Sequence, residues 1–160
     1  MGRFLEKREH MFIRRLTKDD YAQALVFFDA LDELHCNARP DCFQRREISY
    51  PYDAFLQVIS EPDCLMIGAF EEKKMLGLLR ASVWRENTVS VCVDNLFVDP
   101  ASRRRGIASA LMKAVDDWAL GKRGAAYRTA RLGFQQGCTF PLPKARYDPT
   151  ALYSRKGIEK

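Results

Sequence analysis

The part of the sequence that most limits the fold lies between residues 64 and 98, where three apolar runs of strand length follow one another. "CLMIGAF" (64–70) and "MLGLLRASVW" (75–84) are joined by the charged turn "EEKK", and "TVSVCVDNLFV" (88–98) follows the turn-like "REN". Short apolar runs bounded by polar turns are typical of neighbouring antiparallel strands. We therefore expect a three-stranded meander in the middle of the chain.

Helical patterns flank this meander on both sides. Apolar residues at positions 22, 25, 26, 28 and 31 mark one face of a helix over 21–35, and a shorter helix fits 52–59. After the meander, residues 105–120 place Ile107, Leu111 and Val115 on one helical face, with Gly121 as the expected C-cap. Further strands are expected at 11–16 and 126–134, then a loop at 135–149 and a short C-terminal helix. This order predicts an α/β (α+β) fold with a mixed, mostly antiparallel central sheet flanked by helices.

Length and composition are those of one soluble globular domain, which we expect to span 11–160 after a polar leader or added extension at 1–10. Of the 160 residues, 47% are hydrophobic and 29% charged, and no apolar run approaches the roughly 18–20 residues needed to cross a bilayer. The net charge of +5 permits an anionic ligand or nucleic acid but does not choose between them. Five cysteines without CxxC spacing, and no signal-peptide pattern, favour free thiols in a reducing cytoplasm, with Cys64 and Cys92 in the core.

The segment "VDPASRRRGIASALM" (98–112) places Arg103, Arg104 and Arg105 directly before Gly106 and the start of a helix. The N-terminus of a helix already carries partial positive charge, so this placement is unfavourable unless an anion lies there. Unpaired backbone N–H groups at a helix start bind phosphate, and a glycine lets the phosphate approach closely. Ala108 and Ser109 keep the next positions small, and the Ser109 hydroxyl can donate to a phosphate oxygen. From the residues alone, the alternative is a solvated arginine run at an ordinary helix start.

The longer stretch "DNLFVDPASRRRGIASALM" (94–112) resembles the acetyl-CoA-binding motif of the GNAT family of N-acetyltransferases. That motif is a strand followed by Q/R-x-x-G-x-G/A at the start of a helix, and Arg103, Gly106 and Ala108 occupy its defining positions. The expected order of elements resembles the family over roughly residues 11–134. The resemblance implies the GNAT fold, acetyl-CoA as acetyl donor, a primary amine of a small molecule or protein as acceptor, and no metal. It implies these cofactor-binding residues: Leu96, Phe97, Val98, Arg103, Arg104, Arg105, Gly106, Ile107, Ala108 and Ser109.

The resemblance also implies a direct attack of the amine on acetyl-CoA, without a covalent acyl-enzyme. The backbone of residues 96–98 would pair with the pantetheine arm, and an N–H there would polarise the thioester carbonyl. Tyr153, four residues before Gly157, matches the spacing of the family's general acid, although Ile158 replaces the usual Phe; an ordinary packed aromatic is the alternative. Asp94 is the best-placed general base, with an exposed carboxylate at a strand end as the alternative. Strand alternation predicts that Asn95 faces the side opposite to Asp94.

The sequence departs from the family pattern towards its C-terminus. The loop at 135–149 is longer than the family norm, and the chain ends at Lys160, after the helix that normally precedes one or two closing strands. We therefore expect a shortened C-terminal end and an open sheet edge, which favours a homodimer. His35, expected in the loop after the first helix, is a candidate for the edge of the acceptor site. Asp29, Asp32 and Glu33 form an acidic patch that would suit a cationic acceptor, although an ordinary solvated helix face is the alternative that such charges favour.

Two functions of other classes stay open beside the enzyme. One is a CoA-binding regulatory or interaction module of the same fold with little or no catalytic activity. The other is a nucleic-acid-binding protein, which ranks last because the aromatic residues are not interleaved with Lys and Arg in a recognition pattern. No membrane partner is expected.

Overall fold

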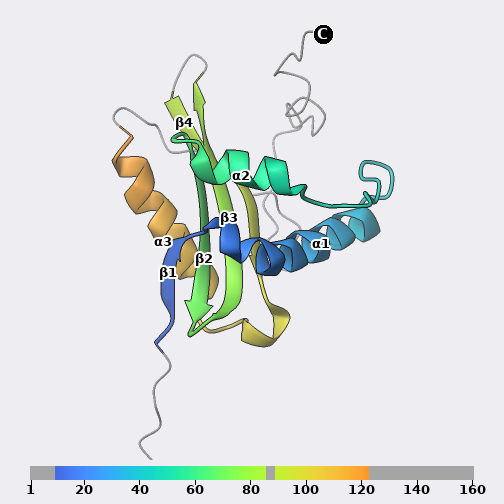
Figure 1. The fold of residues 1–160 in the computed structure, drawn as a ribbon, viewed down its shortest axis with the longest axis horizontal. Coiled ribbons are helices and arrows are strands. Elements are labelled where there is room, and N and C mark those ends of the chain that lie inside the picture. Colours follow the sequence, from blue (N-terminus) through green and yellow to red (C-terminus); the bar gives the residue numbers. More distant parts are fainter. Residues whose placement is uncertain (1–9, 86–88, 123–160) are drawn as a thin grey trace, which may run out of the picture.

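The computed structural model describes residues 10–85 and 89–122 of the chain, and Figure 1 shows how they are arranged. The strands are β1 (Phe12–Arg15), β2 (Cys64–Glu71), β3 (Lys74–Arg85) and β4 (Val89–Val98). The α-helices are α1 (Tyr21–Ala38), α2 (Tyr52–Ser60) and α3 (Ile107–Leu120), and two short 3-10 turns are η1 (Lys18–Asp20) and η2 (Pro100–Ser102). Each helix and strand expected within these ranges is present. The expected strand at 126–134, the loop at 135–149 and the last helix lie outside the described residues.

The four strands form one sheet in the order β1-β2-β3-β4, and each neighbouring pair is antiparallel. The meander expected over 64–98 is confirmed, and β1 adds to the free side of β2. Glu72 and Lys73 alone separate β2 from β3, and Glu72 has a positive φ of 53°, as two-residue hairpin turns require. The described sheet is wholly antiparallel, so the mixed character expected from the sequence depends on the strand at 126–134.

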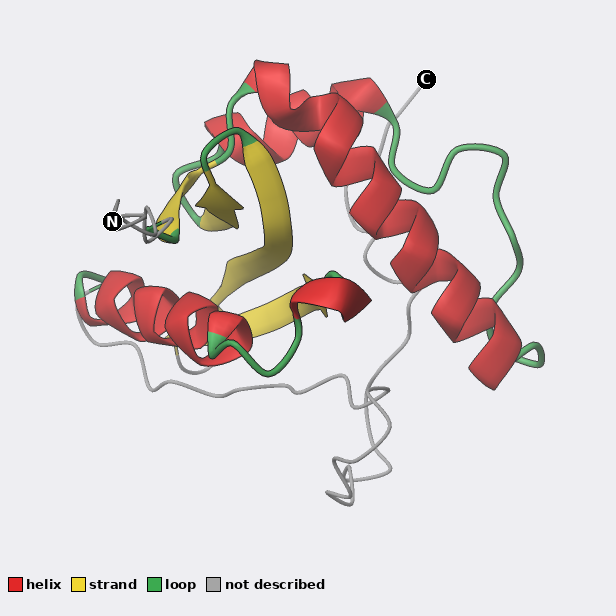
Figure 2. Ribbon diagram, turned by 90° about the horizontal axis from the view of Figure 1, so that it is seen from below, coloured by secondary structure: helices red, strands yellow, loops and turns green. Residues whose placement is uncertain are grey.

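Helices cover both faces of the sheet, which lies between two helical layers in Figure 2. On one face, Leu111 and Val115 of α3 pack fully buried against Leu79 of β3. On the other face, α1 and α2 enclose an aromatic-rich core that includes Phe55 and Phe70. Each such side chain contributes about 1.5–3 kcal/mol when it leaves water, so the two apolar faces of the sheet hold both layers in place.

The face that the first helix turns to the sheet matches the predicted one only in part: Phe28 and Leu31 are buried and Leu25 is partly buried, as expected. Its buried residues are Ala24, Phe27, Phe28 and Leu31, which follow helical spacing, whereas Val26 is 65% exposed. The helix also runs three residues further than expected, to Ala38. The helix carries apolar residues on more than one side, so periodicity identified only part of the buried face. Packing against the sheet adds Phe27, whose ring meets that of Phe97 on β4 edge-on, with centroids 5.7 Å apart.

The last described strand carries one extra residue opposite β3. Arg80 pairs with Asn95, but the next residue of β3 pairs with Val93, so Asp94 has no residue opposite it. Such a bulge interrupts the alternation of side chains. Val93 packs on the α3 side, while Asn95 shares the side of its partner Arg80, whose guanidinium lies over Tyr50 in the core of α1 and α2. Asp94 pairs with the same arginine. The expectation that Asn95 faces away from Asp94 is therefore wrong.

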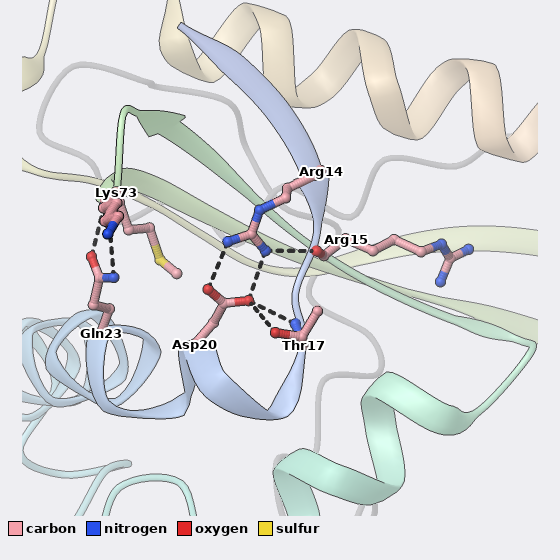
Figure 3. Close-up of polar contacts among 7 residues, drawn as sticks. Arg14, Arg15, Thr17, Asp20, Gln23 and Lys73 are labelled. Carbon is pink, nitrogen blue, oxygen red and sulfur yellow. Dashed lines mark hydrogen bonds and ion pairs between the residues drawn. The ribbon is translucent and has the colours of Figure 1, made fainter.

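Two polar contacts join the start of α1 to the strands beside it (Figure 3). The guanidinium of Arg14 on β1 donates to both carboxylate oxygens of Asp20, at 2.7 and 2.8 Å, and Thr17 donates to the same carboxylate from its backbone N–H and its hydroxyl. The side-chain amide of Gln23 donates to the carbonyl of Lys73 at 3.0 Å and accepts from the N–H of Met75 at 2.8 Å. These bonds fix α1 against β1 and against the β2–β3 turn.

The cysteines within the described ranges are free thiols: Cys36, Cys42, Cys64 and Cys92. Cys64 and Cys92 are only half-buried, contrary to the expectation that they belong to the core. Cys64 is the first residue of β2 and Cys92 lies near the start of β4, both opposite Ser82, so neither reaches the well-packed centre of the sheet. No helix in the part of the chain described by the structure is long and apolar enough to cross a membrane.

Candidate functional site

The connection from β4 to α3 is a tight turn whose backbone requires its glycine. β4 ends at Val98, η2 follows, and α3 begins at Ile107. Gly106 is the N-cap of α3 with φ 76°, in the left-handed region that glycine enters without steric cost. Arg104 also has a positive φ of 65°, a conformation that costs about 1–2 kcal/mol in a residue with a side chain. The arginine run is therefore part of a tight turn with two left-handed residues, which an ordinary helix start does not have.

The entry to this turn is tied to the sheet. The N–H of Asp99 donates to the carbonyl of Leu76 on β3 at 2.9 Å. The buried Ser102 donates to Asp99 twice, from its N–H to the carbonyl at 2.8 Å and from its hydroxyl to the carboxylate at 3.1 Å. Lys74, at the start of β3, places its ammonium 3.8 Å from the same carboxylate. The turn thus starts from a fixed point on the sheet.

A cleft of about 260 Å³ lies at the start of α3, and residues expected to bind the cofactor line it. They are Val98, Arg103, Arg104, Gly106, Ile107, Ala108 and Ser109. The structure thus brings seven of the ten residues expected to bind the cofactor to one cleft. A Cβ built on Gly106 would meet no atom within 4 Å, so the space in front of this glycine is open.

The backbone at the start of α3 offers hydrogen-bond donors to this cleft. The first helical bond runs from the N–H of Ala110 to the carbonyl of Gly106 at 3.0 Å, and no side chain of the described residues caps the helix. The N–H groups of Ile107, Ala108 and Ser109 therefore have no carbonyl partner within the helix. They lie at the positive end of the helix dipole, where an anion is stabilised.

The three arginines of the turn differ in what they contact. Arg103 donates from Nε to the carbonyl of Val98 at 3.3 Å, and its guanidinium lies 5.9 Å from the centre of the Phe97 ring. Arg105 donates through both terminal nitrogens to the carboxylate of Glu71 at the end of β2, at 2.5 and 3.3 Å. These hydrogen bonds lower the pKa of Glu71 from its usual value. Arg104 lines the cleft on the strained part of the turn.

The residues expected to hold the pantetheine arm follow one another at the end of β4. Leu96 packs partly buried on the α3 side, and Phe97 is buried on the α1–α2 side, so neither side chain lines the cleft beside α3. Their backbones pair with β3 on one edge, Leu96 opposite Leu79 and Phe97 opposite Leu78. Within the described residues β4 is the last strand of the sheet, and its other edge pairs with no described strand.

Asp94 lies on the opposite side of β4 from the cleft-lining helix, in a buried position that differs from the exposed strand end considered as its alternative. Its side chain is 10% exposed, and its Oδ2 lies 3.7 Å from Nε of Arg80. Burial raises the pKa of this carboxyl, while the charge of Arg80 and a hydrogen bond from Ser82 lower it, and the net shift is upwards. A buried carboxylate of raised pKa is a group that can exchange a proton.

The other candidates lie elsewhere. Tyr153 is outside the described residues. His35 lies within α1, although a loop was expected, and it stacks on Phe43 with ring centroids 5.0 Å apart. Burial lowers the pKa of His35, and the charge of Asp32 opposes this. The acidic patch lines a second cleft, of about 540 Å³, formed with the segment after α1: Val26, Asp29, Ala30, Asp32, Glu33, Arg45, Arg46 and Glu47. Among residues 10–85 and 89–122, no group of three His, Cys, Asp or Glu side chains could hold a metal ion.

Two residues that contact expected site residues were not identified from the sequence: Glu71, which contacts Arg105, and Arg80, which contacts Asp94. Glu71 is one of four charged residues in "EEKK", and nothing local marks it as the partner of Arg105. Arg80 did carry a signal, because it is a charged residue inside the apolar run "MLGLLRASVW". A charge in such a run requires a buried partner, and that partner is Asp94.

Comparison with known proteins gives a family and a fold. The family model described as "Acetyltransferase (GNAT) family" matches residues 28–136. No curated protein matches the sequence significantly.

Solved structures resemble the chain over most of its length. A variant of the BH1408 protein from Bacillus halodurans has a TM-score of 0.68 at 18% identity, covering 82% of this chain and 98% of its own. The aminoglycoside acetyltransferase meta-AAC0020 from an uncultured soil metagenomic sample has a TM-score of 0.62 at 17% identity, covering 89% and 99%. The aminoglycoside 6'-N-acetyltransferase AAC(6')-Ih from Acinetobacter baumannii has a TM-score of 0.57 at 19% identity, covering 87% and 100%. At these identities the likeness shows the shared fold.

Proposed function

The chain belongs to the acetyltransferase (GNAT) family, and on that premise we propose that it transfers the acetyl group of acetyl-CoA directly to a primary amine. The observation that carries the proposal is the cleft at the start of α3. It combines uncapped helix N–H groups, an open space before Gly106 and the arginines of the turn. A pyrophosphate is the kind of group that these donors and charges fit.

The start of α3 and the end of β4 would hold acetyl-CoA in two ways. The N–H groups of Ile107, Ala108 and Ser109 would bind the pyrophosphate, and Arg103 and Arg104 would add charge around it. The outer edge of β4 at Leu96–Val98 would pair with the pantetheine arm as with an added strand. Acetyl-CoA supplies an acetyl group that its thioester activates towards attack by an amine.

Catalysis would then come from positioning, from a hydrogen-bond donor and from two proton transfers. A backbone N–H of β4 would stabilise the negative charge that develops on the carbonyl oxygen, and the loss of such a donor costs on the order of 10²–10³ in rate. Asp94 would take a proton from the attacking amine, and Tyr153 would give one to the departing thiolate. For Asp94 this role is supported by its burial and raised pKa.

A positively charged amine is the acceptor class that we propose. The cleft beside α1 carries four carboxylates, Asp29, Asp32, Glu33 and Glu47, against two arginines, Arg45 and Arg46, and Arg45 lies 3.4 Å from Glu33. Two of the solved structures that share the fold are aminoglycoside acetyltransferases, and one of these enzymes is also known in complex with sisomicin. Aminoglycosides, amino sugars and lysine-containing peptides are therefore the first acceptors to test.

Calorimetric titration with acetyl-CoA tests the proposal on the wild type and on Gly106→Glu. The substitution places a carboxylate where a phosphate would lie, so we expect micromolar binding, about −8 kcal/mol, in the wild type and none in the variant. Gly121→Glu is the matched control, because it adds the same charge at the other end of α3. Release of free CoA thiol with the acceptor panel then measures transfer. No binding by the wild type refutes the proposal, and binding without transfer to any acceptor favours the CoA-binding module.

A further inference from the structure

The bulge in β4 brings a buried carboxylate and a buried guanidinium together on the face that α1 and α2 cover. The side chain of Asp94 is 10% exposed and that of Arg80 is 18% exposed. The two lie on adjacent strands, Asp94 on β4 and Arg80 on β3. In a strand without a bulge, side chains alternate strictly, so Asp94 and Asn95 would lie on opposite faces of the sheet. With it, both side chains lie on the side of Arg80.

The ion pair leaves part of the carboxylate unused. Nε of Arg80 lies 3.7 Å from Oδ2 of Asp94, beyond hydrogen-bond length. Within the described residues, this buried Oδ2 accepts no hydrogen bond. A buried carboxylate is stable only with charge or hydrogen bonds to compensate for the lost water, so such an oxygen is a strong acceptor for a proton or an N–H group.

The groups around Asp94 come from three elements. Arg80 and Ser82 face it from β3, and Cys64 lies beyond them on β2, where the charges of Arg80 and Asp94 both affect its thiol. The ring of Tyr50, in the segment before α2, lies 5.8 Å from the guanidinium of Arg80. Arg80 is the one positive side chain among these groups, so it alone opposes the effect of burial with a full charge.

We propose that Arg80 is a positioning residue, which holds Asp94 as the proton acceptor for the attacking amine. The inference rests on the proposed acetyl transfer. The N–H bond of the amine breaks as nitrogen bonds to the acetyl carbon, and the proton bonds to Oδ2 of Asp94, directly or through one water. The carbon–sulfur bond of the thioester breaks in turn, and CoA leaves as a thiol with the proton that Tyr153 gives to its sulfur. Arg80 keeps its own protons throughout. The protonated Asp94 returns its proton to solvent before the next cycle.

The physical argument is one of charge. Burial alone favours the neutral carboxylic acid, which cannot take a proton from an amine. An arginine at this distance favours the carboxylate, and because it makes no hydrogen bond to Oδ2, it leaves that oxygen free to react. A neutral side chain in place of Arg80 therefore makes Asp94 ionise at a higher pH.

The test compares Arg80→Met, Arg80→Lys and Asp94→Asn with the wild type by two measurements. The first follows the carboxyl NMR signal of Asp94 against pH in labelled protein, with Asp94→Asn to assign the signal. The second is the pH profile of kcat/KM for one acceptor that the wild type acetylates. The matched control is Arg85→Met, since Arg85 lies on the same strand and pairs with the exposed Asp63 at 3.0 Å.

Arg80→Met is expected to move the midpoint of the Asp94 signal, and the acidic limb of kcat/KM, upwards by about one pH unit. Arg80→Lys keeps the positive charge and is expected to stay close to the wild type in both measurements, and Arg85→Met is expected to leave both unchanged. The part of the pH profile of kcat/KM that reports ionisation of the acceptor amine is expected not to move, because every variant is assayed with the same acceptor.

Two results would overturn the inference. If the midpoint of the Asp94 titration is the same in Arg80→Met as in the wild type, Arg80 does not control this carboxyl. If Asp94→Asn has the kinetics of the wild type, Asp94 is not the proton acceptor. In both cases acetyl transfer by the wild type shows that the proposed function itself still holds. Failure of the wild type to acetylate any acceptor refutes both together.

Discussion

The guanidinium of Arg105 donates two hydrogen bonds to the carboxylate of Glu71, which lies 34 residues earlier in the sequence. This contact joins the arginine turn to the end of β2 and neutralises one of its three charges. Arg103 is turned towards the carbonyl of Val98 and the ring of Phe97. The cleft itself is lined by Arg103 and Arg104, while Arg105 is not among its lining residues.

Arg104 and Arg105 should therefore differ in their contribution to acetyl-CoA binding. We expect Arg104→Gln to weaken binding about tenfold, because it removes a charge that lines the cleft. Arg105→Gln should weaken it about twofold or less, because Glu71 already offsets that charge. Calorimetric titration at two salt concentrations measures both, and Arg85→Gln controls for the loss of net charge. Equal losses in the two variants would contradict this assignment.

Gly77 should be needed for the close approach of α3 to the sheet. A Cβ at this position would lie 3.0 Å from Cγ2 of Ile107, 3.2 Å from the carbonyl oxygen of Phe97 and 3.3 Å from Cδ1 of Leu111. Gly77→Ala must push the first turn of α3 outwards, so we expect a loss of about 1–3 kcal/mol in unfolding free energy. The same shift moves the helix N–H groups, and acetyl-CoA binding should weaken severalfold.

Urea denaturation and calorimetric titration test this prediction for Gly77. The control is Gly121→Ala, because Gly121 has φ −71°, which alanine adopts readily, and lies after the other end of α3. A Gly77→Ala protein with wild-type stability and binding would show that α3 has room to adapt.

Asp20 should make stability depend on pH in the acid range. The hydrogen bonds from Arg14 lower its pKa from 3.8 to about 2, and the side chain is 7% exposed. A carboxyl with a depressed folded-state pKa stabilises the protein above its unfolded pKa, and this contribution is lost as pH falls through the folded value. We expect Asp20→Asn to cost about 1–2 kcal/mol at neutral pH, and the difference from wild type to vanish between about pH 4 and pH 2.

Urea denaturation across this pH range, with the exposed neighbour as the control variant Asp19→Asn, measures the effect of Asp20. A difference between Asp20→Asn and wild type that persists below pH 2 would mean that the contact acts through packing instead of charge.

Gln23 should stabilise the β2–β3 hairpin through its two bonds to the turn. Gln23→Ala leaves the carbonyl of Lys73 and the N–H of the buried Met75 without these partners, so we expect a loss of about 1–2 kcal/mol. Hydrogen exchange should accelerate at the Met75 amide more than at central sheet amides. Gln57→Ala is the control, since Gln57 is an exposed glutamine on α2. Slow exchange at Met75 in Gln23→Ala would exclude this role.

The sequence was sufficient for the elements whose signals are local. The meander was predictable because each of its strands is a compact apolar run with a short turn, and α3 because Ile107, Leu111 and Val115 follow one helical stripe. The cleft was predictable because the arginine-glycine turn and the helix start are adjacent in sequence. For α1 the same reasoning found Phe28 and Leu31 but also chose the exposed Val26, because the helix has apolar residues on several sides and only some of them contact the sheet.

Contacts between distant residues could not be predicted from the sequence. Glu71 meets Arg105 only because the end of β2 lies beside the start of α3. The pairing of Arg80 with Asp94 depends on a bulge, and no residue type in "VCVDNLF" identifies where a strand takes one extra residue. For that reason, the side on which Asn95 lies was predicted wrongly.

The extra residue of β4 also restricts how the length of this chain can change. If residue 94 were deleted, the strand would alternate strictly from Val93 onwards. Asn95 and the residues after it would keep their present faces and their partners on β3, because Val93 and Asn95 already pair with consecutive residues of that strand, and Phe97 would stay against Phe27. Loss of the extra residue would therefore remove the Asp94 carboxylate without disturbing the sheet, whereas gain of a second one would change either the faces or the register of the residues up to Val98.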